Sequence, residues 1–174
     1  IIFLAKAGYL KGEDTYVDYT IVKASRVKTD SFSKVALTQL KRRDPAFDEN
    51  FFIGRAKKAF RIIQDAWTAR KLDKAQAFLS DGIYEQFSIQ LAEMREKGII
   101  YHLEALEIQT AMPVKFQSDR NFDVIHLRID ASAINYRKDE KTGKLIDGSR
   151  SPEPFAEVWS FMRKPGVKTL KKGG

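Results

Sequence analysis

Apolar residues in this chain repeat every three or four positions up to Gly98 and every second position after it. The first clear helical pattern covers residues 31–43, where basic residues surround the apolar positions Phe32, Val35, Ala36 and Leu40. This pattern predicts a short basic amphipathic helix, which either packs on the rest of the domain or lies on a membrane surface. An earlier stretch, residues 16–22, is compatible with a short strand or with a helix turn.

Three more helices are predicted before Gly98. Asp44-Pro45 ends the first helix, and Asp48 or Asn50 offers an N-cap for the second. The second helix has the strongest periodicity, with apolar positions Phe52, Ala56, Ala59, Phe60, Ile63, Ala66 and Trp67. A short helix is expected over residues 72–79. A longer one follows a cap at Ser80 or Asp81, with apolar positions Ile83, Tyr84, Phe87, Leu91 and Met94.

The part after Gly98 predicts an antiparallel meander of strands. The first long strand places six residues on one face, namely Leu106, Ile108, Thr110, Met112, Val114 and Phe116. Pro113 within it indicates an edge position or a bend. The second strand has an apolar face made of Ile125, Leu127, Ile129, Ala131 and Ala133. A short strand over residues 144–147 and a last one over 155–161 complete an α+β fold, with helices on one face of the sheet.

Basic charge is concentrated at the two ends of the chain. Residues 1–43 carry nine Lys/Arg and four Asp/Glu, and residues 163–174 carry five Lys/Arg and no acid. The middle, residues 44–162, carries 17 basic and 19 acidic residues. Such ends attract nucleic acid phosphates or anionic headgroups, or they simply keep a chain soluble. We expect a basic lead-in over 1–43, a domain over 44–170 and a basic tail over 171–174.

No pattern predicts an enzyme, a cofactor or a metal site. The chain has no cysteine, no phosphate loop and no nucleophile elbow, and its two histidines lack the spacing of a helical zinc pair. His126, Arg128 and Asp130 share one strand face, which we interpret as a solvent-side ladder of alternating charge rather than an acid–base cluster. No apolar run is long enough to span a bilayer. Because the chain begins at Ile1, we expect it to be a piece of a longer protein.

Seven aromatic residues are expected in the core, and some of them are candidates to line an apolar pocket between helices and sheet: Phe60, Trp67, Tyr84, Phe87, Phe155, Trp159 and Phe161.

Five segments resemble the Tim44-like domain family, which includes the C-terminal domain of a mitochondrial inner-membrane translocase subunit and bacterial relatives. Residues 60–67 are similar to the family's Phe-x-x-Ile-Gln-x-Ala-Trp helix. The other four segments are residues 44–48, 79–87, 129–136 and 151–161. Each is modest alone, but five in the right order are fairly specific.

The resemblance implies a fold similar to nuclear transport factor 2, of the cystatin-like type, in which helices pack on a curved antiparallel sheet around an apolar pocket. It also implies a non-catalytic protein at the bacterial inner membrane or the matrix face of the mitochondrial inner membrane. Its expected partners are anionic lipid such as cardiolipin and a protein, which is a translocase or chaperone component if the chain is mitochondrial. By position, the membrane-binding candidates are Lys34, Lys41, Arg42 and Arg43.

The leading hypothesis is therefore a membrane-peripheral tether, and protein translocation is the process in which it is expected to act. The second is a small-ligand carrier or an isomerase- or dehydratase-like enzyme of the same fold, which needs an acid or base inside the pocket. The third is a ribosome-associated or RNA-binding module, ranked lower because the basic ends contain few aromatic residues on which bases stack. The oligomeric state stays open.

Overall fold

The computed structural model describes residues 3–5 and 31–164. Four helices come first, namely α1 (Ser31–Arg43), α2 (Glu49–Thr68), the 3-10 helix η2 (Leu72–Phe78) and α3 (Asp81–Glu96). Three long strands follow, namely β2 (Ile99–Ser118), β3 (Asp123–Asp139) and β4 (Leu145–Arg163), and a short strand β1 (Phe3–Ala5) precedes all of them. The element predicted over residues 16–22 and the tail over 171–174 lie outside the described residues.

The helix boundaries follow local chemistry. Asp48 caps α2 by accepting a hydrogen bond from the Phe51 amide at 2.7 Å, and Ser80 caps α3 by accepting one from the Ile83 amide at 3.3 Å. Gly98 follows α3 with φ +63°, a conformation that glycine adopts at no steric cost. These predicted boundaries are confirmed.

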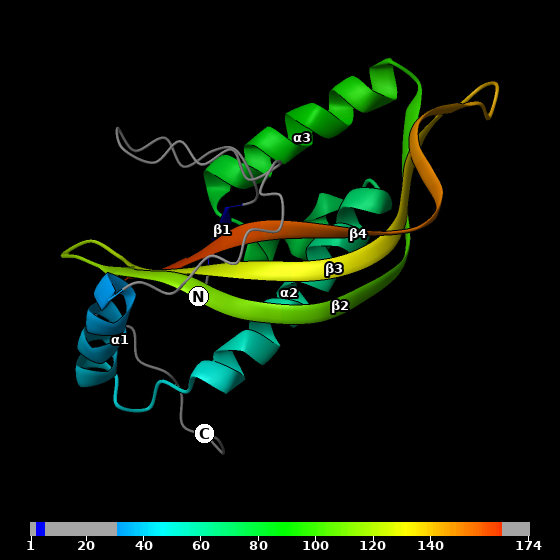
Figure 1. The fold of residues 1–174 in the computed structure, drawn as a ribbon. Coiled ribbons are helices and arrows are strands. Elements are labelled where there is room, and N and C mark those ends of the chain that lie inside the picture. Colours follow the sequence, from blue (N-terminus) through cyan, green and yellow to red (C-terminus); the bar gives the residue numbers. More distant parts are fainter. Residues whose placement is uncertain (1–2, 6–30, 165–174) are drawn as a thin grey trace.

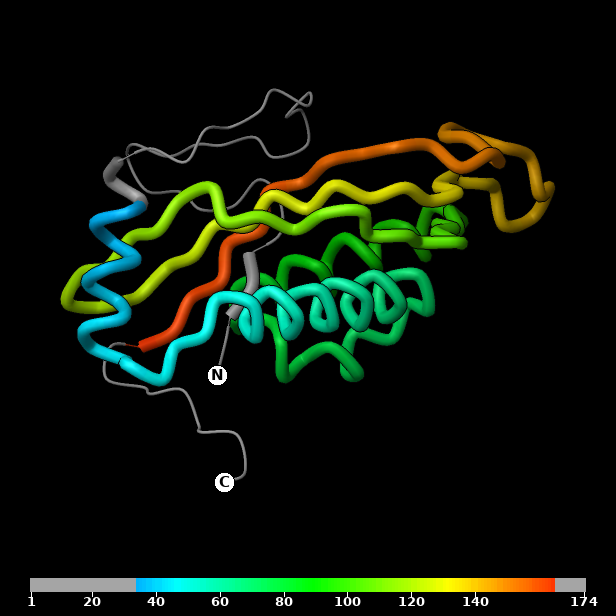
Figure 2. Tube along the Cα trace, turned by 60° about the horizontal axis from the view of Figure 1, so that its bottom comes forward, coloured from blue at the N-terminus to red at the C-terminus, as the bar shows by residue number. Residues whose placement is uncertain are grey.

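The strands form one antiparallel sheet in the order β1-β4-β3-β2. Figure 1 shows β2, β3 and β4 as long strands that bend together at the end nearest the α3 C-terminus. Figure 2 shows α2 and α3 beneath one face of the sheet, while α1 lies across the opposite end of the strands. The α+β class, with helices on a curved antiparallel sheet, is confirmed. Within the described ranges, no helix combines the length and the apolar character needed to cross a membrane.

One strand replaces the two short strands predicted over residues 144–147 and 155–161. β4 pairs with β3 from Leu145 to Arg163, with irregular register near Ala133. Pro152 and Pro154 lie in the part of β4 between the two predicted strands, and β1 pairs only with residues 160–162 of β4. Most of β4 is therefore an edge among the described strands, and prolines are tolerated there.

The face predicted for β2 is wrong at Thr110 and Met112. Register shifts occur between Glu104 and Glu107, between Ile108 and Thr110, and between Pro113 and Lys115. Each extra residue breaks the strict alternation of faces. Ala111 consequently packs on the core, Met112 is 44% exposed, and Thr110 donates a hydrogen bond to Asp130 on the other face. Among the described strands β2 lies at an edge of the sheet, which agrees with the edge alternative predicted from Pro113.

A single hydrophobic core joins the helices to the sheet. Phe60 of α2 packs edge-on against Trp159 of β4 with ring centroids 4.5 Å apart, and both side chains are fully buried. Ala36 and Leu40 of α1 belong to the same core. The domain boundary between residues 43 and 44 stays a prediction, although α1 and the rest share this core.

Candidate functional site

The predicted basic helix α1 is amphipathic, but its apolar side is occupied. Ala36 and Leu40 are buried in the core, at 5% and 2% exposure. Lys34, Lys41 and Arg42 are exposed. Val35, which was predicted on the apolar face, is 55% exposed and lies outside the core. In this arrangement α1 presents charge outward and keeps its apolar face inside the protein.

Arg43 does not belong with the other three membrane-binding candidates. Its guanidinium forms an ion pair with the carboxylate of Asp123 at 3.0 Å, and it also donates to the backbone oxygen of Asp119 at 3.4 Å. The Asp123 side chain is only 5% exposed, so Arg43 fixes the end of α1 to the turn between β2 and β3. Lys34, Lys41 and Arg42 form no ion pair within the described residues, and we call these three the α1 cations.

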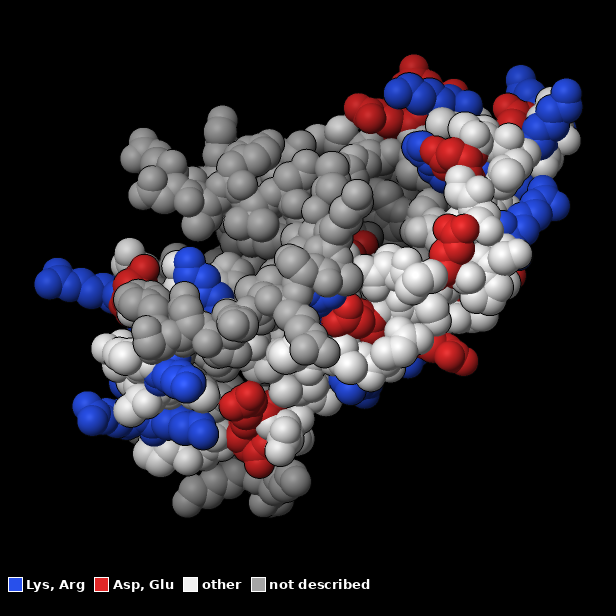
Figure 3. Space-filling model, in the orientation of Figure 1, with Lys and Arg blue, Asp and Glu red and all other residues white. Residues whose placement is uncertain are grey.

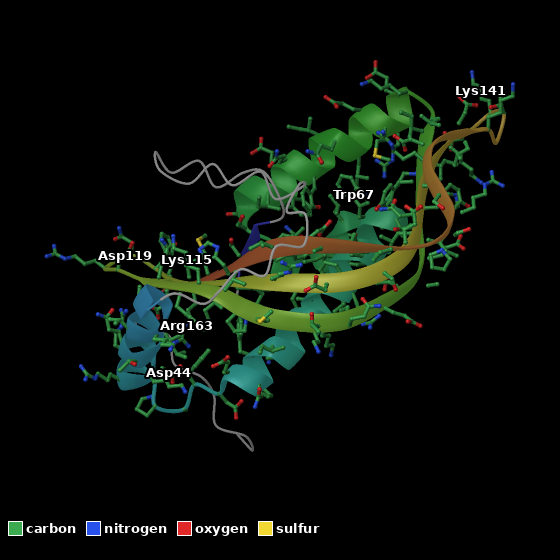
Figure 4. The ribbon with its side chains drawn as sticks, viewed as in Figure 1. Asp44, Trp67, Lys115, Asp119, Lys141 and Arg163 are labelled. Carbon is green, nitrogen blue, oxygen red and sulfur yellow. The ribbon has the colours of Figure 1, made fainter. Side chains whose placement is uncertain are left out.

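A second arginine completes a buried charge cluster beside α1. Arg163, at the end of β4, bonds to Asp44 at 2.6 Å and approaches Asp123 at 3.5 Å. The Asp44 side chain is 2% exposed, and Ser118 donates a hydrogen bond to Asp123 at 2.5 Å. Figure 4 shows Asp44 and Arg163 close together below the sheet. We call Arg43, Asp44, Asp123 and Arg163 the ion-pair lock, since they join α1, the β2–β3 turn and β4.

The remaining carboxylate near this turn is also engaged. Asp119 accepts hydrogen bonds from the backbone amides of Phe122 and Asn121, which lower its pKa below the ordinary value. Asp44 and Asp123 are thus paired with arginines in the interior and exposed Asp119 is bonded to backbone amides, whereas the α1 cations form no ion pair among the described residues. Figure 3 shows the resulting cluster of blue atoms over the α1 end, at the lower left of the molecule.

The polar face of β3 differs from the predicted solvent-side ladder. His126 and Arg128 are buried, at 8% and 5% exposure. Arg128 bonds to Asp130 at 2.9 Å, and this pairing lowers the pKa of Asp130. The three polar side chains do share a face, but only the Asp130 side chain, at 31% exposure, reaches water. Alternation predicts which face a residue occupies, and it says nothing of what covers that face.

His126 links two strands through both ring nitrogens. Its Nδ1 lies 2.7 Å from the Ser160 hydroxyl and its Nε2 lies 3.1 Å from Gln117 Oε1. Because Gln117 Oε1 only accepts, Nε2 is assigned the proton and Nδ1 accepts from Ser160. Burial, followed by the charge of Lys115, lowers the pKa of His126 to about 4. Such a histidine is a weak base, and Ser160 at 0% exposure is not accessible to a substrate.

The seven pocket candidates lie together on the helix side of the sheet. Phe60, Phe87, Trp159 and Phe161 are buried core residues, while Trp67, Tyr84 and Phe155 are half-buried and pack against them. Trp67 contacts Phe87 edge-on at 5.1 Å and lies between α2 and α3 in Figure 4. The structure confirms their place in the core, and the pocket itself stays a prediction.

Metal-binding chemistry finds no support among the described residues. Nowhere in residues 31–164 do three His, Asp or Glu side chains gather as a possible metal site. Asp139 and Glu140, the two carboxylates at the β3–β4 turn, are engaged: Asp139 accepts from the Thr142 amide at 2.7 Å and Glu140 pairs with Arg70 at 3.2 Å.

Residues 33–172 match the family model of the Tim44-like domain. The chain belongs to the Tim44-like domain family. All five segments that predicted this resemblance lie inside the match. Among solved structures, this Tim44-like chain is similar to the intermembrane space region of the chloroplast protein ARC6, with 11% identity and a TM-score of 0.35 over 63% of this chain and 82% of that chain. A sequence comparison with curated proteins finds no match.

The ion-pair lock escaped sequence analysis. Asp44 and Arg163 are 119 residues apart, and each had a local explanation, as a helix breaker and as part of a basic tail. No local periodicity marks such a pair. Tim44-like domains are generally non-enzymatic, and the absence of a catalytic residue here stays a prediction.

Proposed function

We propose that this Tim44-like domain is a peripheral membrane tether that binds anionic lipid through the α1 cations and holds a protein partner at the membrane. The observation that carries the proposal is the contrast at the α1 end. Its cations are exposed without ion pairs in the described chain, while the nearby carboxylates of Asp44 and Asp123 are buried and paired with arginines. The family's association with membranes and translocation supports it.

The proposed binding is electrostatic rather than insertive. Ala36 and Leu40 are buried in the core, so α1 cannot place them in a bilayer without leaving the domain. Each Lys or Arg near an anionic surface contributes about 1 kcal/mol, and this contribution is screened by salt. Binding through the α1 cations should therefore weaken strongly as ionic strength rises.

The test is co-sedimentation with vesicles of phosphatidylcholine, with and without cardiolipin, at low and high salt. We expect cardiolipin-dependent binding that fades with salt and is lost in the variant Lys34→Glu/Lys41→Glu/Arg42→Glu. A matched variant, Lys58→Glu/Lys74→Glu/Lys97→Glu, reverses three exposed lysines elsewhere and has the same net charge. Equal loss in both variants would reduce the effect to overall charge, and no loss in either would refute the assigned site.

The place and the partner are part of the proposal. We propose the bacterial inner membrane or the matrix face of the mitochondrial inner membrane, with a translocase or chaperone component as partner if the chain is mitochondrial. Cross-linking in intact membranes, followed by identification of the linked protein, tests this. Tight RNA binding that survives competition by cardiolipin vesicles would instead favour the RNA-associated function.

One observation favours a second function, the binding of a small ligand. Gln64 is 1% exposed, and its side-chain oxygen has no hydrogen-bond partner. It lies on α2 between the pocket candidates Phe60 and Trp67. A buried acceptor without a donor costs free energy, and a ligand hydroxyl or amide would satisfy it. Native mass spectrometry of the purified chain tests this, since a retained ligand should disappear in Gln64→Leu but not in the exposed control Gln76→Leu.

A further inference from the structure

The hairpin made by the last part of β3 and the first part of β4 carries two adjacent apolar side chains that are exposed to solvent. We call residues 134–154 the arm. Leu145 and Ile146 are 46% and 48% exposed. Lys138 pairs with Leu145 while Arg137 pairs with Asp147, so Ile146 is an extra residue in β4. This irregularity interrupts the alternation that would otherwise place one of the two neighbours on each face.

The arm carries five Lys/Arg and four Asp/Glu, a net charge of +1, and three of its four acids are engaged while Glu153 is exposed. Asp147 is bonded to Arg137, Glu140 pairs with Arg70, and Asp139 accepts backbone amides of the turn. Hydrogen bonding to Arg137 and to the turn amides lowers the pKa of Asp147 and of Asp139, so both stay ionised but engaged. The lysines of the arm form no ion pair in the described chain, and they are Lys138, Lys141 and Lys144.

The arm is built as a defined structure. The Glu140 amide donates to the Gly98 carbonyl at 2.7 Å, which ties the turn to the start of β2. Gly148 has φ +87°, and a Cβ there would lie 2.3 Å from the Asn135 carbonyl oxygen, so the two strands approach too closely for any other residue. Figure 4 shows Lys141 at the tip, at the far end of the molecule from Asp44. Leu145 and Ile146 are thus presented at a fixed place.

We infer that the arm is a second membrane contact, in which Leu145 and Ile146 enter the interfacial region of an anionic bilayer and the three arm lysines meet its headgroups. The inference rests on the proposed tether function and adds a site at the other end of the molecule. Aliphatic side chains beside lysines have the chemistry of interfacial anchoring, where apolar burial and electrostatic attraction add.

A lipid surface fits the arm better than a protein or a nucleic acid. Protein interfaces bury about 800 Å² on each partner and favour Trp, Tyr and Arg over Lys. The arm does contain Tyr136, Arg137 and Arg150, but the Tyr136 ring is stacked on His102 with Arg150 over it, and Arg137 is paired with Asp147. Nucleic acid would use the lysines, but exposed aliphatic residues give bases no ring on which to stack. A bilayer needs no matching shape.

The experiment places an environment-sensitive fluorophore on the arm. Since the chain has no cysteine, Leu145→Cys gives a single labelling site in the full chain. The control is Ile89→Cys, because Ile89 is 55% exposed on α3 but lies one helical turn from Glu85 and from Glu93. We expect cardiolipin vesicles to shift the emission of the Leu145 label to the blue and to leave the Ile89 label unchanged. In unlabelled protein, Leu145→Ser/Ile146→Ser should weaken vesicle binding about tenfold and Ile89→Ser should not.

The outcomes separate this inference from the tether function. If the protein co-sediments with vesicles but the Leu145 label does not shift, the arm is not a membrane contact and the tether function stands. If the label shifts equally on vesicles without anionic lipid, the role of the lysines is refuted. If nothing co-sediments at low salt, the tether function fails and the arm inference fails with it.

Discussion

The α1 end and the arm are both basic, yet they use apolar residues in opposite ways. At the α1 end the aliphatic side chains of Ala36 and Leu40 are buried, and Val35 is the one aliphatic side chain among the described residues of α1 that is exposed beside the α1 cations. On the arm, Leu145 and Ile146 face outward together with lysines. If both ends contact lipid as proposed, the α1 end does so mainly through charge, whereas the arm adds the burial of apolar side chains.

The interactions that hold the two ends in place also differ. The α1 end depends on the ion-pair lock, whose two carboxylates are almost fully buried. The arm depends on a close backbone approach at Gly148 and on the exposed pair of Arg137 and Asp147. Exposed pairs contribute little, whereas breaking a buried pair is costly. Substitutions should therefore damage the α1 end more than the arm.

The largest expected effect is that of Arg163→Met. This change removes the cation that faces both Asp44 and Asp123, and we expect a loss of about 3 kcal/mol in the free energy of unfolding. Urea denaturation measures the loss. Arg42→Met, which removes an exposed arginine of α1, is the control and should change stability by no more than about 0.5 kcal/mol. If both variants lose the same amount, the lock does not stabilise the α1 end.

A pH effect of similar size should come from His126, which pairs with Lys115 at the α1 end of the sheet (Figure 4). Its pKa is about 4 in the folded chain and returns to about 6.5 on unfolding, so only the unfolded chain takes up the proton between these values. The contribution of neutral His126 to the free energy of unfolding should be fully present above pH 6.5. It should fall as the pH drops toward 4, by up to about 3 kcal/mol at the lower end. Unfolding free energies measured from pH 7 to pH 4.5 should show this slope in the native chain and not in His126→Gln. An equal slope in both would assign it to other groups.

At the arm, Gly148→Ala should cost about 2 kcal/mol, because a methyl group meets the Asn135 carbonyl and the backbone has positive φ. Gly143→Ala is the matched control, since Gly143 also has positive φ (+68°) but its Cβ would meet nothing within 4 Å. We expect a loss of about 1 kcal/mol there. Hydrogen exchange of the arm amides should rise more in Gly148→Ala, and the opposite order would contradict the role of the close approach.

The smallest expected effect, that of Val35→Ser on vesicle binding, tests most directly whether the α1 end and the arm contact lipid differently. Val35→Ser removes the exposed apolar side chain of α1, and we expect vesicle binding to change less than twofold. The same kind of change at Leu145 and Ile146 should weaken binding clearly. A large effect at Val35 would mean that α1 also inserts apolar residues, and the two ends would then share one mode of contact.

Sequence periodicity predicted the helices well, because a helix depends on contacts between residues three and four positions apart. The apolar positions of α2 are buried, with Trp67 half-buried, and both predicted caps are present. The strands were harder. One extra residue moves every later side chain to the other face of the sheet, so the bulges of β2 made the predicted faces of Thr110 and Met112 wrong. β4 was predicted as two short strands but is one strand, which contains two prolines.

The candidate site was predictable in part. The position of the basic helix follows from its pattern, and Lys34, Lys41 and Arg42 are exposed as expected. The role of Arg43 depends on Asp123, which comes 80 positions later, and the burial of His126 and Arg128 depends on what covers the sheet. Neither property is encoded in a local pattern. Exposure of Leu145 and Ile146 likewise depends on the register of the arm.

The irregular edges of the sheet have a consequence for many copies gathered in one place. Proteins confined to a surface collide often, and long flat edge strands would then join into filaments. β2 carries three register shifts and a proline, with Ala105 at φ +52°, and β4 carries Pro152 and Pro154. A strand from another copy could form backbone hydrogen bonds with such an edge over only a few residues before the register no longer matched. The irregular edges of the described strands therefore disfavour strand-to-strand joining between copies of the chain.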